Sequence, residues 1–307
     1  MAKNNSLLQK IAVIGAGNVG STIVYTLMLK NLAAQIVLID INDRKEKGEV
    51  LDLDDGLCFV ETGCVKGGDF RDAADADLII LTAGLAQKPG ETRLQLAKKN
   101  QDIARSVFKK IGQLKKTAVI IVVTNPVDVI TYAVQQACSL PKSQVFGSGT
   151  SLETARLRTA LSHLLKVNSV SIDGFCLGEH GDSGFVAWST ITVGGAPISK
   201  FIKSQKELKV IEKRVKNEVY EIIKRKGATF FGIAMVVTDI VEAVVLNQRK
   251  VMPISSRLAG WNGVSGVCLS APAVIGRQGV VKLWPLKLTG EEKKKFQTSA
   301  KKIKQYL

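Results

Sequence analysis

The first half of the chain alternates short apolar runs with segments of helical periodicity. Four runs rich in β-branched residues predict strands: residues 11–14, 36–39, 78–82 and 118–123. Their apolar positions are consecutive and not alternating, which is typical of strands that helices cover on both faces. The segments between the runs are long enough to form crossover helices. The pattern therefore predicts an α/β domain with a doubly wound parallel sheet.

The pattern changes near residue 147. A helix is predicted to begin after Gly149, with Thr150 or Ser151 as its N-cap and Glu153 in its first turn. The segments expected after it are strands around residues 172–177 and 185–193, a charged helix over residues 204–226, and an apolar helix after residue 227.

The end of the chain, LTGEEKKKFQTSAKKIKQYL, predicts an amphipathic helix. Thr289 is its expected N-cap, and Phe296, Ile303 and Leu307 lie on its apolar side. No internal repeat or low-complexity linker separates the two halves. We therefore predict two domains, residues 1–147 and 148–307, the second with α+β architecture.

A glycine motif follows the first predicted strand and opens the next helix, with glycines at Gly15, Gly17 and Gly20. In a dinucleotide-binding turn the first glycine permits the tight turn. The second lets the backbone approach a pyrophosphate, and the third allows close helix–strand packing. Asp40 ends the second predicted strand, where a carboxylate can accept hydrogen bonds from ribose hydroxyls and repel a 2′-phosphate. The motif favours NAD over NADP; the alternative is a plain glycine-rich turn beside a surface Asp.

Composition limits the other classes of function. The 307 residues, 46% of them hydrophobic and 23% charged, are ordinary for a globular protein. Five scattered cysteines without a C-x-x-C pair and only two histidines predict neither a disulfide framework nor a metal site. The start lacks the apolar run of a secretory signal, and no uncharged apolar stretch is long enough to cross a membrane. We therefore expect a soluble, cytoplasmic protein.

His180 is the first candidate for a catalytic group. It lies among glycines and charged residues in GEHGDSG, which suits a site loop, whereas His163 in TALSHLLKV is typical of an ordinary helix residue. Imidazole titrates near neutral pH and can therefore donate or accept a proton during a reaction. A lone histidine is more often solvated or buried than catalytic, so the hypothesis requires partners.

Glu153 and Arg156 are candidate partners, because an i, i+3 spacing puts both side chains on one helix face. The carboxylate could orient an imidazole, and the guanidinium could bind a substrate carboxylate through two parallel hydrogen bonds. The alternative is an intrahelical salt bridge.

Two further candidates lie where predicted strands end. The segment QKPGETR carries Arg93 and follows the strand that ends near residue 82, while Asn125 follows the next strand, in VTNPVD. Loops at the carboxyl ends of parallel strands are where ligands bind in such folds. The alternative for the Arg93 segment is a solvated connection.

The order of these motifs resembles that of the NAD-dependent L-lactate and malate dehydrogenases over nearly the whole chain: GAGNVG, LID, TAGLAQKPGETR, TNPVD, GTSLETARLR, GEHGDS, KGATFFGIA and PAVIGRQGV. The resemblance implies a Rossmann domain, a substrate domain and a homotetramer. It also implies that His180, oriented by Glu153, donates a proton to a keto oxygen. Arg156 would pair with the substrate carboxylate, Arg93 would polarise the carbonyl, and Asn125 would help place substrate and nicotinamide. The implied NAD-binding residues are Gly15, Gly17, Asn18, Val19, Gly20, Asp40, Thr82, Ala83, Gly84 and Asn125.

The choice of substrate depends on Gln87, which matches the position where lactate dehydrogenases have Gln and malate dehydrogenases have Arg. A neutral amide cannot compensate the second carboxylate of oxaloacetate, so the resemblance implies reduction of pyruvate to L-lactate. Thr229, which matches a substrate-pocket Thr, favours the same choice. The alternatives are an L-2-hydroxyisocaproate-type enzyme for branched 2-oxo acids and, less favoured by Gln87, a malate dehydrogenase.

The sequence departs from the family at two places. Glu153 stands where the family has Asp, which makes the carboxylate arm one methylene longer. Arg158 matches an Arg that binds fructose 1,6-bisphosphate in many bacterial lactate dehydrogenases, but Asp173 replaces the His that accompanies it. A carboxylate beside a phosphate is repulsive, so we expect weak or absent activation by this effector.

Two other classes of function compete with an enzyme. The net charge of +16 suggests a nucleic-acid-binding protein, but acidic residues alternate with the lysines of the helix over residues 204–226, which is typical of a solvated face. A catalytically inactive dinucleotide-binding protein is the second competitor. A serine hydrolase is disfavoured because G-x-S-x-G is missing from the sequence.

Overall fold

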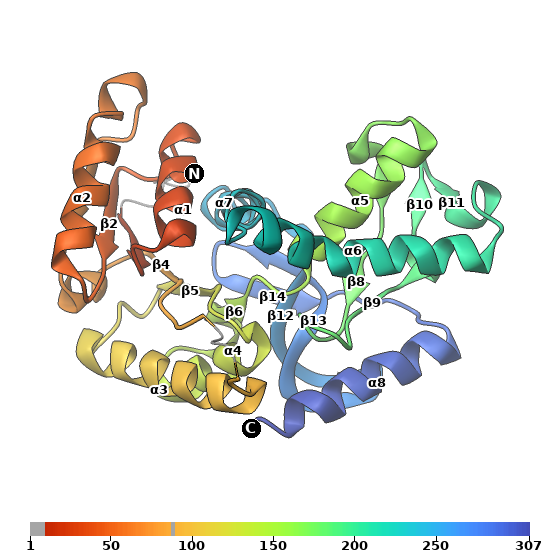
Figure 1. Cartoon of the computed structure of the whole chain (residues 1–307). Coiled ribbons are helices and arrows are strands. Elements are labelled where there is room, and N and C mark those ends of the chain that lie inside the picture. Colours follow the sequence, from red (N-terminus) through yellow and green to blue (C-terminus); the bar gives the residue numbers. More distant parts are fainter. Residues whose placement is uncertain (1–9, 87–89) are drawn as a thin grey trace, which may run out of the picture.

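The computed structural model describes residues 10–86 and 90–307 (Figure 1). The first half forms parallel strands joined by helices. Its strands are β1 (Lys10–Ile14), β2 (Gln35–Ile39), β3 (Cys64–Gly67), β4 (Leu78–Leu81), β5 (Val119–Val122) and β6 (Val145–Gly147). Its helices are α1 (Asn18–Leu29), α2 (Asp43–Asp54), α3 (Arg93–Ile111) and α4 (Val127–Ala137). The predicted doubly wound parallel sheet is confirmed, and β3 and β6 are additions that the apolar runs did not reveal.

The second half contains helices and antiparallel strands. Its helices are α5 (Ser151–Leu165), α6 (Gln205–Lys226), α7 (Phe231–Val245) and α8 (Gly290–Lys304). Its strands are β7 (Ile172–Asp173), β8 (Cys176–Leu177), β9 (Phe185–Val186), β10 (Thr192–Val193), β11 (Ala196–Pro197), β12 (Lys250–Trp261), β13 (Val264–Gly276) and β14 (Gly279–Leu283). Short 3₁₀ turns lie at Leu57–Phe59, Phe70–Ala73, Lys142–Gln144, Ser169–Ser171, Trp188–Thr190 and Ile198–Lys200.

One large sheet runs through both halves. Its strand order is β14-β13-β12-β6-β5-β4-β1-β2-β3, and strands β1 to β6 pair in parallel, whereas β12 to β14 pair antiparallel. Within residues 10–86 and 90–307, the two parts pair at one position, where Ser255 of β12 lies opposite Gly147 of β6. The β-ribbon of the second half thus extends the parallel sheet of the first. The proposed boundary at residue 147 remains a prediction.

The helices bury the sheet on both faces. One core cluster combines the sheet with α1 and with α7, a helix of the second half that packs beside α1 (Figure 1). The other face is covered by α3 and α4. Every residue of β1, β4 and β5 is apolar and buried except Lys10, which is partly buried. This burial explains why continuous apolar runs identified those strands.

Three expectations for the second half need correction. Residues 172–177 and 185–193 form pairs of two-residue strands separated by turns, not two continuous strands, because Gly174 has a φ of +123° and Ser189 lies in a 3₁₀ turn. The helix start at Ser151, after the N-cap Thr150, agrees with the prediction. In α8, Phe296 and Ile303 are buried as predicted, but Leu307 lies beyond the helix and is 46% exposed.

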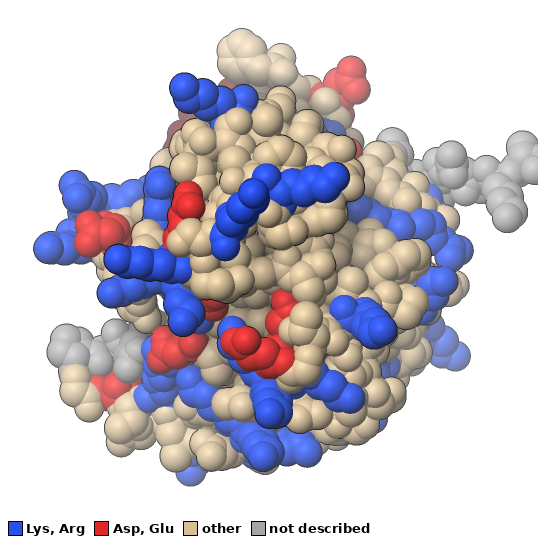
Figure 2. Space-filling model, turned by 90° about the vertical axis from the view of Figure 1, so that its right-hand side faces the viewer, with Lys and Arg blue, Asp and Glu red and all other residues tan. Residues whose placement is uncertain are grey.

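Charged side chains are distributed and not segregated. Figure 2 shows Lys and Arg over the face on which α6, β10 and β11 lie, with acidic side chains among them. Within α6 and α8, ion pairs such as Lys216–Glu212 and Lys295–Glu291 join residues one turn apart. This mixture favours a solvated surface over a nucleic-acid-binding one. Among the described residues, no helix is long and apolar enough to cross a membrane.

Candidate active site

The glycine turn between β1 and α1 is built by packing that tolerates no side chain at two of its three glycines. A Cβ on Gly15, whose φ is +113°, would lie 2.6 Å from Thr82 Oγ1, and a Cβ on Gly20 would lie 1.8 Å from the carbonyl oxygen of Gly15. A Cβ on Gly17 would meet no atom within 4 Å. Gly17 is therefore not required by internal packing, and its open position fits the close approach of a ligand to the backbone.

The N-terminus of α1 lies at Gly17, beside this free space. Gly17 is its N-cap and offers no side chain to the first N–H groups, and the first turn has no acidic residue. Free N–H groups at a helix N-terminus bind anions such as a pyrophosphate. The residues present thus fit the phosphate part of a dinucleotide.

Asp40 lies directly beside the glycine turn. Its carboxylate accepts hydrogen bonds from the backbone N–H of Ala16 at 2.6 Å and from that of Asn42 at 2.9 Å. These bonds fix the carboxylate at the end of β2, next to the turn, where one carboxylate can still accept bonds from a ribose. The predicted pairing of Asp40 with the glycine motif is therefore present in the geometry.

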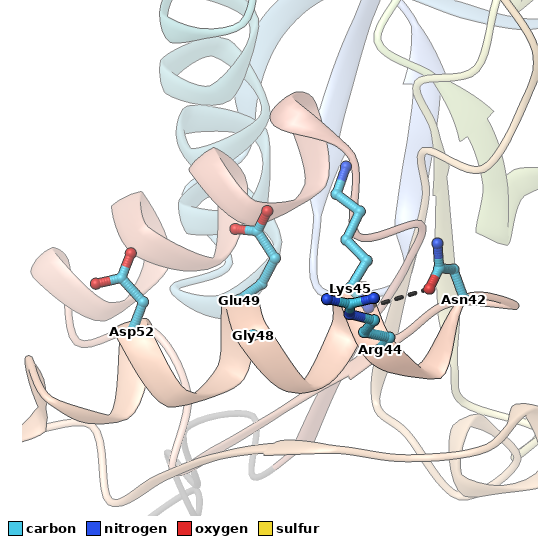
Figure 3. Close-up of a pocket in the computed structure, with 6 residues that line it drawn as sticks. All are labelled: Asn42, Arg44, Lys45, Gly48, Glu49 and Asp52. Atoms are coloured by element: carbon cyan, nitrogen blue, oxygen red, sulfur yellow. Dashed lines mark hydrogen bonds between the residues drawn. The ribbon is translucent and has the colours of Figure 1, made fainter.

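A surface pocket of about 440 Å³ continues from this point along α2 (Figure 3). Its side chains are polar: Asn42, Arg44, Lys45, Glu49 and Asp52, with Gly48 between them. Asn42 caps the helix by accepting a hydrogen bond from the backbone N–H of Lys45 at 3.1 Å. The pocket is open and lies on one helix, so it adds no catalytic group to the site.

The ends of β4 and β5 bring Thr82, Gly84 and Asn125 to the same edge of the sheet. The Thr82 hydroxyl lies 3.0 Å from the carbonyl oxygens of Ile14 and Gly15, which joins β4 to the glycine turn. Buried Asn100 of α3, which sequence reasoning missed, donates a hydrogen bond to the backbone oxygen of Asn125 at 2.7 Å. Its side-chain oxygen also accepts a bond from Leu85 N–H at 2.8 Å. Asn100 thereby ties the two loops together, and Asn125 precedes a cis peptide bond to Pro126.

His180 and Glu153 lie in contact, as the pairing hypothesis requires. His180 Nδ1 is 2.9 Å from Glu153 Oε1, and both side chains are about four-fifths buried. Two hydrogen bonds set this distance by joining α5 to β8. Thr150 Oγ1 donates to the Cys176 carbonyl at 2.6 Å, and the Cys176 N–H donates to Thr154 Oγ1 at 3.0 Å. The longer Glu arm therefore still reaches the imidazole.

Asp128, at the start of α4, is a second carboxylate at His180 that sequence reasoning missed. It is buried, and it accepts hydrogen bonds from the backbone N–H of His180 at 2.8 Å and from Ser255 Oγ at 2.5 Å. Burial raises the pKa of Asp128 to about 6, although these two hydrogen bonds oppose the rise. Its position in TNPVD, three residues after Asn125, was the available signal.

The two carboxylates determine the protonation of His180. Burial alone would lower the pKa of His180, but the adjacent Glu153 and then Asp128 outweigh it and raise this pKa to about 9. Burial would likewise raise the pKa of Glu153, and the imidazolium charge instead holds it below its ordinary value. The site thus favours a charged imidazolium beside a carboxylate at neutral pH, which is the form that donates a proton.

Arg156 lies one turn after Glu153 and is buried, with 8% of its side chain exposed. Glu153 pairs with His180, whereas Arg156 forms an ion pair with Glu218 of α6, at 3.7 Å from Nε to Oε1. The intrahelical salt bridge that was the alternative is thus not the pairing observed among the described residues. A buried guanidinium with one long contact retains donors for an anionic ligand.

Arg93 is the first residue of α3, whose N-cap is Thr92. Its guanidinium makes a two-pronged contact with Asp182, at 2.5 Å from Nη1 to Oδ2 and 3.0 Å from Nη2 to Oδ1. Asp182 follows His180 by two residues, so this contact brings Arg93 to the His180 loop. The side chain is 44% exposed, which leaves it accessible.

The other predicted site residues are placed as follows. Thr229 is half-buried in the link before α7, which packs against α5. Gln87 lies outside the described residues. Arg158 Nη2 is 3.8 Å from Asp173 Oδ1, so the carboxylate that replaces the family His faces the Arg directly. Among the described residues, no group of three or more His, Cys, Asp and Glu side chains is arranged to hold a metal ion.

The sequence matches the models of a known protein family over both halves of the chain. The model of the lactate/malate dehydrogenase NAD-binding domain matches residues 9–147, and that of the α/β C-terminal domain of the same enzymes matches residues 150–307. The chain belongs to the lactate/malate dehydrogenase family. The expected family and its NAD-binding domain are thus confirmed.

Individual relatives are similar over their whole length. The chain is 40% identical to an L-lactate dehydrogenase of Acetivibrio thermocellus, over 99% of this chain and 98% of the relative. It is 42% identical to an L-lactate dehydrogenase of Thermoanaerobacter, over 97% of each chain. The crystal structure of the minor L-lactate dehydrogenase from Enterococcus mundtii in its ligands-bound form superposes with a TM-score of 0.94, at 39% identity over 98% of both chains. The predicted fold class is confirmed.

Proposed function

We propose that this protein is an NAD-dependent L-lactate dehydrogenase that interconverts pyruvate and L-lactate. The observation that carries the proposal is the buried His180–Glu153 pair with Arg156 one helical turn away. A proton donor and a carboxylate-binding guanidinium are what a 2-oxo acid requires. The whole-length similarity to L-lactate dehydrogenases supports the same reaction.

The residues divide the work as follows. Bound NADH supplies the hydride that reduces the carbonyl carbon. Arg156 binds the substrate carboxylate, and imidazolium His180 donates its proton to the carbonyl oxygen. Glu153 stabilises the imidazolium, and Arg93 approaches the same oxygen, where negative charge develops. In the reverse direction neutral His180 accepts the hydroxyl proton.

Gln87 supports pyruvate as the substrate. It matches the position where lactate dehydrogenases have Gln, and an uncharged amide at that position would leave the second carboxylate of oxaloacetate without a counter-charge, so that desolvating it is costly. Thr229, which matches a substrate-pocket Thr of the lactate dehydrogenases, supports the same choice because its side chain is uncharged. Branched 2-oxo acids, the substrates of L-2-hydroxyisocaproate-type enzymes, are the alternative.

The cofactor we propose is NAD(H) and not NADP(H). Asp40 is held at the end of β2 by Ala16 and Asn42, so its charge cannot readily move away from a 2′-phosphate. Repulsion between the Asp40 carboxylate and a 2′-phosphate beside it would weaken the binding of NADP(H). The NADH-to-NADPH ratio of kcat/KM measures this preference.

We also propose a homo-oligomer, with a homotetramer as the form that the family resemblance implies. Large apolar side chains are exposed on α1, α2, α7 and the turn Leu57–Phe59: Tyr25 52%, Leu51 69%, Phe59 86%, Phe231 63% and Met235 54%. Helix α1 lies between α2 and α7 and contacts both (Figure 1). Exposed apolar side chains gathered on adjacent elements mark association surfaces. Sedimentation velocity of the purified protein tests the assembly.

The decisive experiment is an initial-rate panel with NADH against pyruvate, oxaloacetate and 2-oxoisocaproate. We expect kcat/KM to be highest for pyruvate. Preference for oxaloacetate would contradict the reasoning from Gln87, and preference for 2-oxoisocaproate would establish the branched-acid alternative. Absence of activity with all three, in protein that binds NADH, would leave a non-catalytic dinucleotide-binding protein.

A further inference from the structure

The loop that carries His180 holds a second carboxylate, Glu179, whose surroundings the proposed reaction does not explain. Glu179 is 8% exposed, and its Oε2 accepts a hydrogen bond from Ser183 N–H at 3.0 Å and another from Ser183 Oγ. The same oxygen lies 2.9 Å from Nζ of Lys302, in the last turn of α8. Within the described residues, the only cation that forms an ion pair with this buried carboxylate therefore comes from a helix more than a hundred residues later in the chain.

Helix α8 also contacts this loop through uncharged groups. Ser299 is fully buried, and its Oγ donates a hydrogen bond to the Ser183 carbonyl at 2.7 Å. A Cβ on Gly178 would lie 2.7 Å from Ser299 Oγ, and one on Gly184 would lie 2.4 Å from the Glu179 carbonyl. The Gly178 end of the loop thus has no spare room against α8, which runs beside β9 in Figure 1, and the Gly184 end has none against the backbone of Glu179.

Two ion pairs flank His180 in its loop, one before it in sequence and one after it. Glu179 pairs with Lys302, and Asp182 pairs with Arg93. Without its cation, Glu179 would be a buried carboxylate held only by Ser183, and such a group either draws in water or moves toward solvent. Because Glu179 and His180 are adjacent, either movement would displace the imidazole from Glu153.

We propose that Lys302 is a positioning residue for the reaction: from α8 it holds Glu179 and thereby fixes the loop that presents His180. The inference rests on the proposed 2-oxo acid reduction, in which a displaced imidazole lowers the rate of proton transfer. A misplacement of about 1 Å can reduce turnover on the order of 100-fold. A side chain remote from substrate is thus expected to affect kcat and not the binding of NADH.

The test compares three variants of the full-length protein. Lys302→Met removes the charge and keeps an apolar stem, and Lys302→Arg keeps the charge. Lys301→Met is the matched control, because Lys301 is exposed on the same helix and has no ion pair with another described residue. The measurements are kcat and KM for pyruvate, the dissociation constant of NADH from fluorescence quenching, and the melting temperature.

We expect Lys302→Met to lower kcat about tenfold or more, while the NADH dissociation constant stays within about twofold. Lys302→Arg should retain at least about half of kcat, and Lys301→Met should match the parent protein. Equal kcat in Lys302→Met and Lys301→Met would overturn the inference. It would also be overturned if Lys302→Arg lost as much kcat as Lys302→Met, because the charge would then not be what matters.

A double variant covers the case in which Lys302→Met fails to fold. In a Glu179→Gln background no buried charge needs Lys302, so adding Lys302→Met should change kcat by less than about twofold. A full tenfold loss there would show that Lys302 does not act through Glu179. Failure of the proposed function is distinguishable, because the parent protein itself would then fail to reduce pyruvate.

Discussion

Replacing Glu153 by Gln is the sharpest test of how His180 is charged. The change removes one negative charge and keeps the shape of the side chain. Glu153 Oε1 lies 2.9 Å from His180 Nδ1, a distance at which two unit charges attract by about 6 kcal/mol at an effective dielectric of about 20. The pKa of His180 is raised from 6.5 to about 9, which corresponds to about 3 kcal/mol. Glu153 is therefore the main cause of the rise, Asp128 adds to it, and burial opposes both.

Without this carboxylate, burial and Arg156 both lower the pKa of His180, and Asp128 remains to raise it. We expect the pKa to fall below its ordinary value. The pKa of about 9 keeps the parent imidazole almost fully protonated at pH 7.5, whereas the variant imidazole would be mostly neutral there. Because reduction requires the imidazolium, kcat/KM for pyruvate should fall at least about tenfold at pH 7.5 and recover toward pH 5.5.

Lactate oxidation requires the neutral imidazole, so its rate increases with pH. In the variant this increase should begin at a lower pH than in the parent protein. The assay is a pH series of initial rates in both directions, with Glu221→Gln on the exposed side of α6 as a control of equal charge change. An unchanged high-pH limit for pyruvate reduction in Glu153→Gln would refute the reasoning. Equal loss at every pH would show that Glu153 orients His180 without setting its charge.

Four further predictions follow from the site and its supports. Arg156→Lys should raise the KM for pyruvate about 30- to 100-fold, because an ammonium cannot form two parallel hydrogen bonds to a carboxylate; the KM for NADH, measured in the same rates, should hardly change. Fructose 1,6-bisphosphate should leave the pyruvate KM within about twofold, since Asp173 faces Arg158, and a clear fall in KM would contradict this. Gln87→Arg should shift kcat/KM from pyruvate toward oxaloacetate, and an unchanged ratio of the two would exclude Gln87 from substrate choice. Thr289→Ala should lower the free energy of unfolding by about 1 kcal/mol in urea titration, because Thr289 and Glu292 cap each other at the start of α8.

The apolar pattern predicted the part of the fold whose strands are buried on both sides. Strands β1, β4 and β5 are almost wholly apolar, so their runs stand out from the helices around them. The ribbon of β12 and β13 gave no such signal, although these are the longest strands. Its buried positions include Ser255, Ser256 and Ser270, each at most 2% exposed, and Pro253 interrupts the run. Buried serines and prolines therefore divided these strands into apolar runs too short to be recognised.

The site shows a similar division. His180, Glu153 and Arg156 could be proposed because rare residue types and helical spacing mark them locally. Asn100 and Lys302 could not, and Asp128 had only its place in TNPVD as a signal, because each contacts a residue distant in sequence. Asp128 bonds His180 N–H from 52 positions away, and Lys302 reaches Glu179 across 123. Only the folded chain shows which of its many carboxylates and lysines these are.

These remote contacts explain how the site accommodates Glu153 in place of the family Asp. The imidazole ring is held by Glu153, but the backbone that carries it is held separately, by Asp128 at its own N–H and by α8 through Glu179 and Ser183. Helix α5 is fixed to β8 through Thr150 and Thr154, independently of its carboxylate. Since neither partner depends on the Glu153–His180 contact for its position, a longer arm changes the path of one flexible side chain and leaves the ring in place. The expectation that one extra methylene preserves an active pair therefore follows from the supports around the pair.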